Sequence, residues 1–360
     1  MALRFEPRKG TSRAMLIATP LLAVLLTLVA GVILFLSLNI EAGAALYHFF
    51  IEPLESLSSI GEVLIKAAPL IMIAVGLAVG FRANVWNIGA EGQLTLGAIA
   101  SGGVALAFWH SEGAYILPLM MLAGILGGMA WAAIPAFLRA RFQVNEILSS
   151  LMLSYVAGLL LSTLVYGPWK DPEGMNFPQS RMFNDSETIA PLIEGTRIHI
   201  GVAIALLVVL VAAVLIERTL VGFEIKVAGL APAAARLAGF RQNRLTWLSF
   251  LLSGGLAGLA GMLEVAGPIG QLVPVITPGY GFTAIIVAFL GRLNPIGILF
   301  AGLLMALSYV GGENAQIAVG LPRAATGVFQ GLLLFFLLAT DFLVRYRVRW
   351  IHRGRQEVRS

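Results

Sequence analysis

The 360-residue sequence contains no cysteine and few charged side chains. The absence of cysteine excludes disulfide bonds and thiolate metal ligands. Charged residues make up 12% of the chain, whereas a soluble domain carries about 25%. The four histidines show no metal-binding spacing; they are His48, His110, His199 and His352. These shortages argue against a soluble domain and against a metal site.

Sequence signatures of catalysis and nucleotide binding are also missing. No GxxxxGK[ST] loop occurs, so we expect no ATP binding of the Walker type on this chain. There is no HExxH motif and no supported Ser/His/Asp arrangement. The few carboxylates in apolar segments form no chain with histidines that would relay protons. We therefore expect neither enzymatic activity nor a cofactor on this chain.

Long apolar runs dominate what is present. Hydrophobic residues make up 58% of the chain, and the mean hydropathy is +0.88. Several runs approach the roughly 20 residues that cross a bilayer. The first run is too long for a signal peptide, so we expect it to be retained. The sequence predicts an all-α polytopic membrane protein with about ten spans, near 14–38, 60–81, 92–109, 114–138, 145–166, 199–217, 246–264, 281–291, 295–312 and 322–344.

The distribution of basic residues predicts the orientation of these spans. With both termini in the cytoplasm, most of the 24 basic residues lie on the cytoplasmic side. The predicted organisation is a cytoplasmic N-terminus (1–13), a membrane domain (14–344) and a basic cytoplasmic tail (345–360). The membrane domain contains an external loop (167–198) and a cytoplasmic loop (218–245). A basic tail directly after a span favours contact with the lipid bilayer over nucleic acid.

Two apolar spans lead into polar or glycine-rich breaks. The segment 60–81 precedes NVWNIGAEG, and 246–264 precedes GPIGQLVPVITPGYG. The two spans are predicted to run in opposite directions, a pattern typical of an inverted repeat with the transport pathway between its halves. Our candidate pathway residues are Asn84, Trp86, Asn87, Glu91, Gln93, Glu264, Gln271, Thr277, Tyr280 and Phe282.

Glu91 is the carboxylate that most needs an explanation. An ionised side chain at the centre of a bilayer costs about 2.5–3.5 kcal/mol on insertion scales. Irregular backbone at that depth must be buried in protein or line a cavity. Glu91 either caps the following helix, pairs with Arg82, or contacts the substrate. Trp86 and Phe282 either stack on a planar substrate or pack within the bundle. Asn145 is expected to cap a helix.

The predicted cytoplasmic loop contains the segment GLAPAAARLAGF. Pro232 suits a first helical position and Gly239 suits a helix end. The segment predicts a short helix outside the bilayer. Its residues are Ala231, Pro232, Ala233, Ala234, Ala235, Arg236, Leu237 and Gly239. A carrier that works alone has no need of such a helix.

Four segments together resemble one family of membrane proteins. NVWNIGAEGQLTLGA resembles the NxGxEGQ signature of bacterial ABC importer permeases in the branched-chain amino acid and simple-sugar superfamily. RARFQVNEILSSLMLSYVA resembles a segment of its nucleoside branch, with Ser154 where that branch commonly has asparagine. VAGLAPAAARLAGF followed by SGGLAGLAGMLEVAG resembles the cytoplasmic loop and the next span. GFTAIIVAFLGRLNPIGILFAGLL resembles the late pair of spans. The likeness covers about residues 60–340.

This resemblance implies a type II-like permease subunit that forms half of the translocation pathway for nucleosides. It is closest to the larger permease of importers with basic-membrane-lipoprotein-type binding proteins. The implied partners are a shorter homologous permease, an external substrate-binding lipoprotein, and cytoplasmic ATPase subunits that bind ATP and contact 231–239. The implied location is the bacterial inner membrane. Simple sugars or branched-chain amino acids remain alternative substrates, and a stand-alone secondary transporter is a further alternative.

Overall fold

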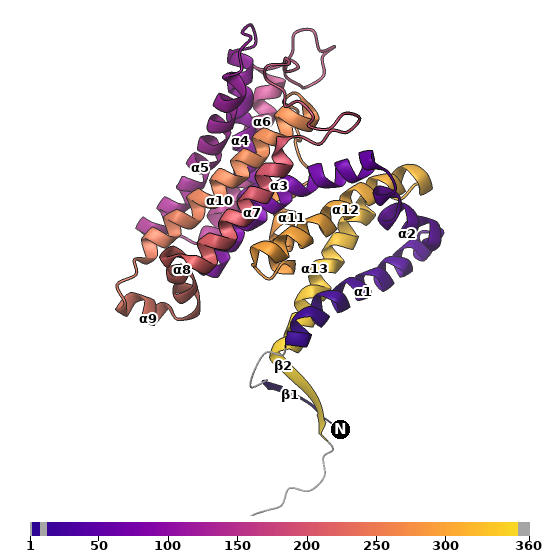
Figure 1. The fold of residues 1–360 in the computed structure, drawn as a ribbon, viewed down its shortest axis with the longest axis vertical. Helices are drawn as coiled ribbons and strands as arrows, with labels where there is room; N and C mark the ends of the chain where they lie inside the picture. The colour runs from indigo at the N-terminus through magenta and orange to yellow at the C-terminus, as the bar shows by residue number, and fades with distance from the viewer. Residues whose placement is uncertain (1, 8–12, 352–360) are drawn as a thin grey trace, which may run out of the picture. The chain divides into compact units, whose positions relative to one another are not determined.

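A computed structural model describes residues 2–7 and 13–351 of the chain, and most of this part is helical (Figure 1). A helix lies at each of the ten predicted apolar segments: α1 (Arg13–Ser37), α3 (Leu57–Arg82), α4 (Ala90–Ala107), α5 (Ile116–Phe142), α6 (Glu146–Tyr166), α7 (Ile200–Arg218), α10 (Gln242–Glu264), α11 (Tyr280–Leu290), α12 (Pro295–Val319) and α13 (Arg323–Arg345). The other helices are α2 (Ala42–Phe50), α8 (Leu220–Leu230) and α9 (Pro232–Leu237), with a 3-10 turn at Glu52–Leu54 and a π turn at Val265–Ile269. A two-stranded antiparallel ribbon pairs β1 (Ala2–Pro7) with β2 (Tyr346–Ile351).

Seven of the helices in the described part of the chain are long and apolar enough to cross a membrane. The apolar part of α1 and the whole of α11 are shorter. α4 has 18 residues, but Glu91 and Gln93 in its first turn lower its hydropathy. The structure therefore supports a polytopic helical membrane protein, and the number of ten spans stays a prediction.

The chain divides into two compact units, Met1–Glu52 with Gly311–Ser360, and Pro53–Val310. In the first unit, α1 packs against α13, and the Thr340 hydroxyl donates to the Thr19 carbonyl over 3.2 Å. Phe35, Phe49 and Phe329 form part of a buried core there. The ring centroids of Phe49 and Phe329 are 4.9 Å apart.

The second unit is built around α3 and α10, which are the most buried of its spans. α10 packs closely on α5 and α4 because glycines lie on both sides of the contact. A Cβ at Gly258 would collide with the backbone of Gly124 and Gly128 on α5. Small residues let membrane helices approach until their backbones touch. The SGGLAGLAG run of α10 therefore explains the tight centre of this unit.

The loop at 167–198, which we predict to be external and call the external loop, packs against the second break, GPIGQLVPVITPGYG at residues 267–281. Ser180 N donates to the Leu272 carbonyl (2.9 Å), Phe183 N to Gly270 (2.8 Å) and Ile189 N to Ala266 (2.8 Å). The loop thus satisfies backbone carbonyls that the π turn and the following irregular segment leave open.

Candidate functional site

The first break, residues 83–89, is held by an amide network inside the second unit. Asn87 Nδ2 donates to Gln93 Oε1 (2.9 Å) and to Ser253 Oγ on α10 (2.7 Å). Asn87 Oδ1 accepts from Gln93 Nε2 (3.0 Å) and Gly89 N (3.0 Å). These four bonds use the full hydrogen-bonding capacity of the Asn87 amide. Asn87 and Gln93 are buried, so their hydrogen bonds fix the backbone of the break inside the unit.

Glu91 connects the first break to the second. Its Oε1 accepts from the Thr277 hydroxyl (2.7 Å), and its Oε2 accepts from the backbone N–H of Gly281 (2.6 Å). Gly281 lies in the first turn of α11, whose early N–H groups have no partner within the helix. A carboxylate at this position also interacts favourably with the helix dipole. Glu91 therefore caps α11, although it belongs to the first turn of α4.

This arrangement differs from the two structural roles expected for Glu91. The sequence predicted that it would cap its own helix or pair with Arg82. The Arg82 side chain instead donates from Nε to the Leu293 carbonyl over 2.9 Å. A Cβ at Gly281 would collide with the backbone of Glu91, so the contact between α4 and α11 requires glycine there.

The other candidates near the second break are dispersed. The Gln271 side chain reaches Gln179 of the external loop (Nε2 to Oε1, 3.4 Å). Tyr280 is buried, and its ring lies edge-on to Tyr309 at 5.5 Å. Phe282 is 39% exposed. Glu264 ends α10 near the positive charges of Lys66 and Arg197. The structure thus pairs Asn87 with Gln93 and Glu91 with Thr277, and it leaves Glu264, Gln271, Tyr280 and Phe282 apart from these pairs.

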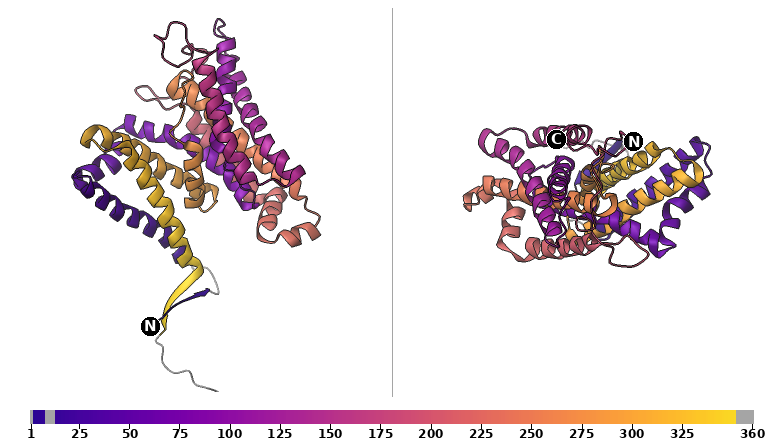
Figure 2. Two further views of the ribbon diagram at one scale, coloured as in Figure 1. Left: turned by 180° about the vertical axis from the view of Figure 1, so that it is seen from behind. Right: turned by 90° about the horizontal axis from the view of Figure 1, so that it is seen from above.

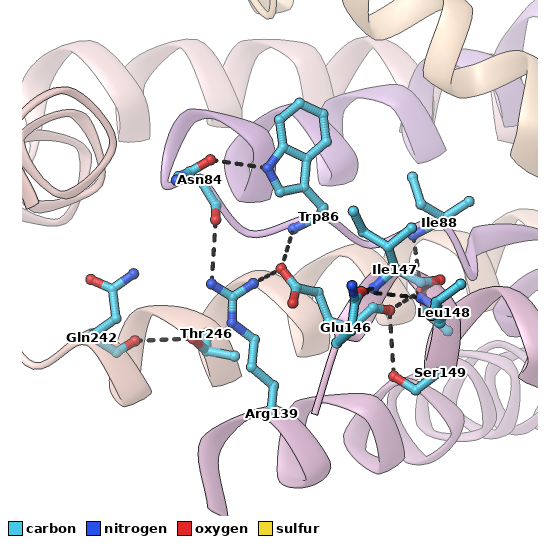
Figure 3. Close-up of polar contacts among 12 residues, drawn as sticks. Asn84, Trp86, Ile88, Arg139, Glu146, Ile147, Leu148, Ser149, Gln242 and Thr246 are labelled. Atoms are coloured by element: carbon cyan, nitrogen blue, oxygen red, sulfur yellow. Dashed lines mark hydrogen bonds and ion pairs between the residues drawn. The ribbon is translucent and has the colours of Figure 1, made fainter. Parts of the chain in front are cut away.

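A second network, which the sequence analysis missed, ties the first break to the turn between α5 and α6 (Figure 3). Arg139 forms an ion pair with Glu146, whose Oε1 also accepts from Trp86 N over 3.3 Å. Arg139 Nη2 donates to the Asn84 carbonyl (3.4 Å), and Trp86 Nε1 donates to Asn84 Oδ1 (2.9 Å). Asn145 caps α6 as predicted, accepting from Ile147 N at 2.9 Å.

Hydroxyl groups on α6 continue this attachment along α4. Ser150 Oγ accepts from Ile88 N (3.1 Å), and Ser154 Oγ accepts from Gly92 N (3.3 Å). A Cβ at Gly92 would collide with the backbone at Ser154. The spacing of four residues between the two serines places them on one helix face, and this is the signal that could have identified them.

Trp86 packs against protein rather than standing free in a pathway. Its ring lies 5.0 Å from that of Phe81 and 6.1 Å from that of Phe289, nearly parallel to the latter. These ring contacts are those of packing within the bundle, and stacking on a planar substrate stays a prediction.

The predicted cytoplasmic helix is present as α9, at one end of the second unit (Figure 2). Pro232 is its first residue, and Gly239 follows its end with φ +82°. Ala235 is 1% exposed and belongs to a core cluster with Phe250 and Leu245. Leu237 is 91% exposed. The expectation that this whole segment faces a partner is therefore wrong for Ala235, because a six-residue helix lying on a bundle buries one side.

Comparisons with known proteins place this architecture among transport proteins. The family described as branched-chain amino acid transport system / permease component matches residues 59–338. The chain is 39% identical to the glucose ABC transporter permease protein TsgB13 of Haloferax volcanii, over 96% of this chain and 93% of that protein. It is 30% identical to the nucleoside ABC transporter permease protein NupB of Lactococcus lactis (91% and 92% covered). It is 28% identical to the guanosine ABC transporter permease protein NupP of Bacillus subtilis (91% and 94%). The matched region includes both breaks and α9.

Proposed function

The chain belongs to the branched-chain amino acid transport system / permease component family, and from this premise we propose that it forms half of the translocation pathway of an ABC importer for nucleosides. Its membership makes it a multi-pass membrane permease of an ABC transporter. In the proposed assembly a shorter homologous permease forms the other half, and an external lipoprotein delivers the substrate. Separate subunits bind and hydrolyse ATP. The assembly lies in the cytoplasmic membrane, with both termini of this chain inside.

We place the translocation pathway beside the two breaks. We further propose that the chain has about ten spans and that the segment containing the first break and the segment containing the second break are equivalent parts of an inverted repeat. In each segment a buried apolar helix, α3 or α10, leads into irregular polar backbone and then into a helix that starts at membrane depth. Irregular backbone at this depth is tolerated where it lines a cavity or is buried in protein. Glu91 joins the two breaks, and its bonds to Thr277 and Gly281 support this location.

The chemistry of the breaks favours a neutral, hydroxyl-rich substrate. The groups gathered there are amides and hydroxyls, and the carboxylate of Glu91 already accepts two hydrogen bonds. A nucleoside offers hydroxyl groups on its sugar and a flat base, both without net charge. This use of the Glu91 charge within the protein supports a neutral substrate, and the identity of 28–30% to nucleoside and guanosine permeases supports a nucleoside among neutral substrates.

A sugar such as glucose is the second candidate substrate. It is favoured by the 39% identity to the glucose permease TsgB13, which exceeds the 28–30% identity to the nucleoside permeases. Both substrate classes present hydroxyl groups, so the amides and hydroxyls of the breaks suit either of them. Only a nucleoside also carries a planar base.

Uptake by cells that carry the complete transporter distinguishes the candidates. Radiolabelled guanosine, adenosine, glucose, ribose and leucine are compared, with an ATPase-dead transporter as the control. We expect guanosine and adenosine to accumulate above this control and to compete with each other. Accumulation of glucose without nucleosides would replace the first candidate by the second. Accumulation of leucine alone would contradict both.

A further inference from the structure

An apolar groove runs along the outer side of α10, where this helix lies between α5 and α7 (Figure 1). The groove consists of two adjoining hollows of about 190 and 420 Å³, and Leu215, Leu252 and Leu256 border both. Only apolar side chains and one glycine, contributed by α3, α5, α7 and α10, line the hollows. The larger hollow alone lies within the range of about 300–1,000 Å³ that is typical of small-ligand pockets.

The length of the groove matches one leaflet of a bilayer. Its floor on α10 extends from Leu248 to Leu259. At 1.5 Å per residue this is about 17 Å, close to half of the roughly 30 Å hydrocarbon core. Gly255 keeps the floor low, because a Cβ there would approach the Met129 side chain to 3.2 Å. A single acyl chain has the length and the chemistry to fill this space.

Arginines follow the groove at one end. Arg244 lies one helical turn before Leu248 on α10, and Arg218 lies one turn after Leu215 on α7, so each shares a helix face with a groove residue. Both are exposed. The acidic groups here are Glu217 and Glu224, and Glu224 lies 3.9 Å from Arg244. The segment 217–244, which connects α7 to α10, holds five basic side chains against these two acids and therefore carries a net positive charge.

We propose that this groove is a binding site for an anionic phospholipid. One acyl chain lies along α10, and the phosphate is held between Arg218 and Arg244. Guanidinium groups bind phosphate oxygens through paired hydrogen bonds. The lipid belongs to the cytoplasmic leaflet in the orientation proposed above. The site itself is independent of the transported substrate. A helix of a partner subunit would also cover apolar surface, but it would supply no phosphate for the two arginines.

The absence of native cysteine allows the site to be tested with a single fluorophore. Val211→Cys places the label on the wall of the groove, at a residue that is 56% exposed. Leu159→Cys on α6, 69% exposed, provides a matched reporter away from the groove. The full chain, purified with its co-expressed partner subunits, is placed in lipid nanodiscs. Quenching is then measured with phosphatidylglycerol or phosphatidylcholine carrying identical brominated acyl chains.

We expect phosphatidylglycerol to quench the label at position 211 with roughly tenfold preference over phosphatidylcholine, and no preference at position 159. Arg218→Gln with Arg244→Gln should abolish the preference, while Arg141→Gln on α5 should retain it. Leu256→Trp, which fills both hollows, should weaken quenching by both lipids. Equal quenching by the two lipids at 211 would overturn the proposal, as would a preference that survives the double substitution. Quenching at 159 with none at 211 would show that protein covers the groove, and would overturn it too.

Discussion

Removing the Glu91 carboxylate is the most direct test of how the two breaks are connected. Glu91→Leu deprives the Thr277 hydroxyl and the Gly281 N–H of their acceptor. An unsatisfied buried polar group costs about 1–3 kcal/mol, so the two together should cost roughly 2–6 kcal/mol. The loss of a favourable charge at the start of α11 adds about 0.3–1 kcal/mol.

Glu91→Gln is the matched control, because it preserves the shape of the side chain. Its amide oxygen can accept from Gly281 N, and its NH₂ group can donate to the Thr277 oxygen, since a hydroxyl both donates and accepts. Two neutral bonds replace two charge-assisted bonds that are about twice as strong. We therefore expect a cost of roughly 1–2 kcal/mol. The Gln variant should lose less than half as much thermal stability as the Leu variant.

Two assays check this order. Thermal unfolding of the purified complex should give the order wild type, Gln, Leu. ATP-dependent uptake should be abolished by Glu91→Leu in a complex that still assembles, and largely kept by Glu91→Gln. A double-mutant cycle of Glu91→Gln with Thr277→Val should give a coupling of about 0.5–3 kcal/mol. Normal uptake and unchanged stability of the Leu variant would refute the connecting role of Glu91.

Three further predictions concern the parts of the chain outside the breaks. Asp185→Cys should react with an impermeant maleimide added to intact cells and Arg236→Cys only after permeabilisation, and the reverse pattern would invert the topology. Leu237→Asp should weaken co-purification with the ATPase subunit without affecting membrane insertion. Ala235→Glu should instead impair folding, so expression of folded Ala235→Glu protein at the wild-type level would contradict the buried position of Ala235. Burial raises the pKa of Glu187 in the external loop, so the folded state holds its proton more tightly than the unfolded state does. The stability that this proton contributes is present below the unfolded pKa and is lost as pH rises through the folded pKa. Glu187→Gln should therefore make the thermal unfolding temperature depend less on pH. An unchanged pH profile of the variant would contradict this prediction.

Hydropathy predicts the helices well because every backbone group of a spanning segment must be satisfied internally. A helix lies at each of the ten predicted segments, and the differences occur at polar ends. α10 begins at Gln242 rather than 246, because polar residues excluded by hydropathy still form its first turn. α2 and α8 were not predicted, because α2 has only 9 residues and the 11 residues of α8 include Glu224 and Lys226, so neither resembles a span.

Tertiary partners could not be predicted from the sequence. Glu91 meets Thr277 and Gly281 across 186 and 190 residues, and no local pattern encodes that distance. The burial of Ala235 could not be predicted from the sequence either. The alanines of this short helix are alike, so the sequence does not indicate which of them faces the bundle. Asn145 was predicted correctly because a cap depends on the residues directly after it.

The position of Ser154 links the packing of α6 against α4 to the placement of the first break. Its hydroxyl accepts from Gly92 N, and Gly92 has no room for a side chain against the backbone of α6. Asparagine, common at this position in the nucleoside branch that the segment resembles, is larger and would need space where α4 and α6 already touch. Any such change would shift Gly92 and, with it, the adjacent Glu91 that caps α11. Residue 154 therefore influences the breaks through the placement of α4, without having to contact the transported molecule.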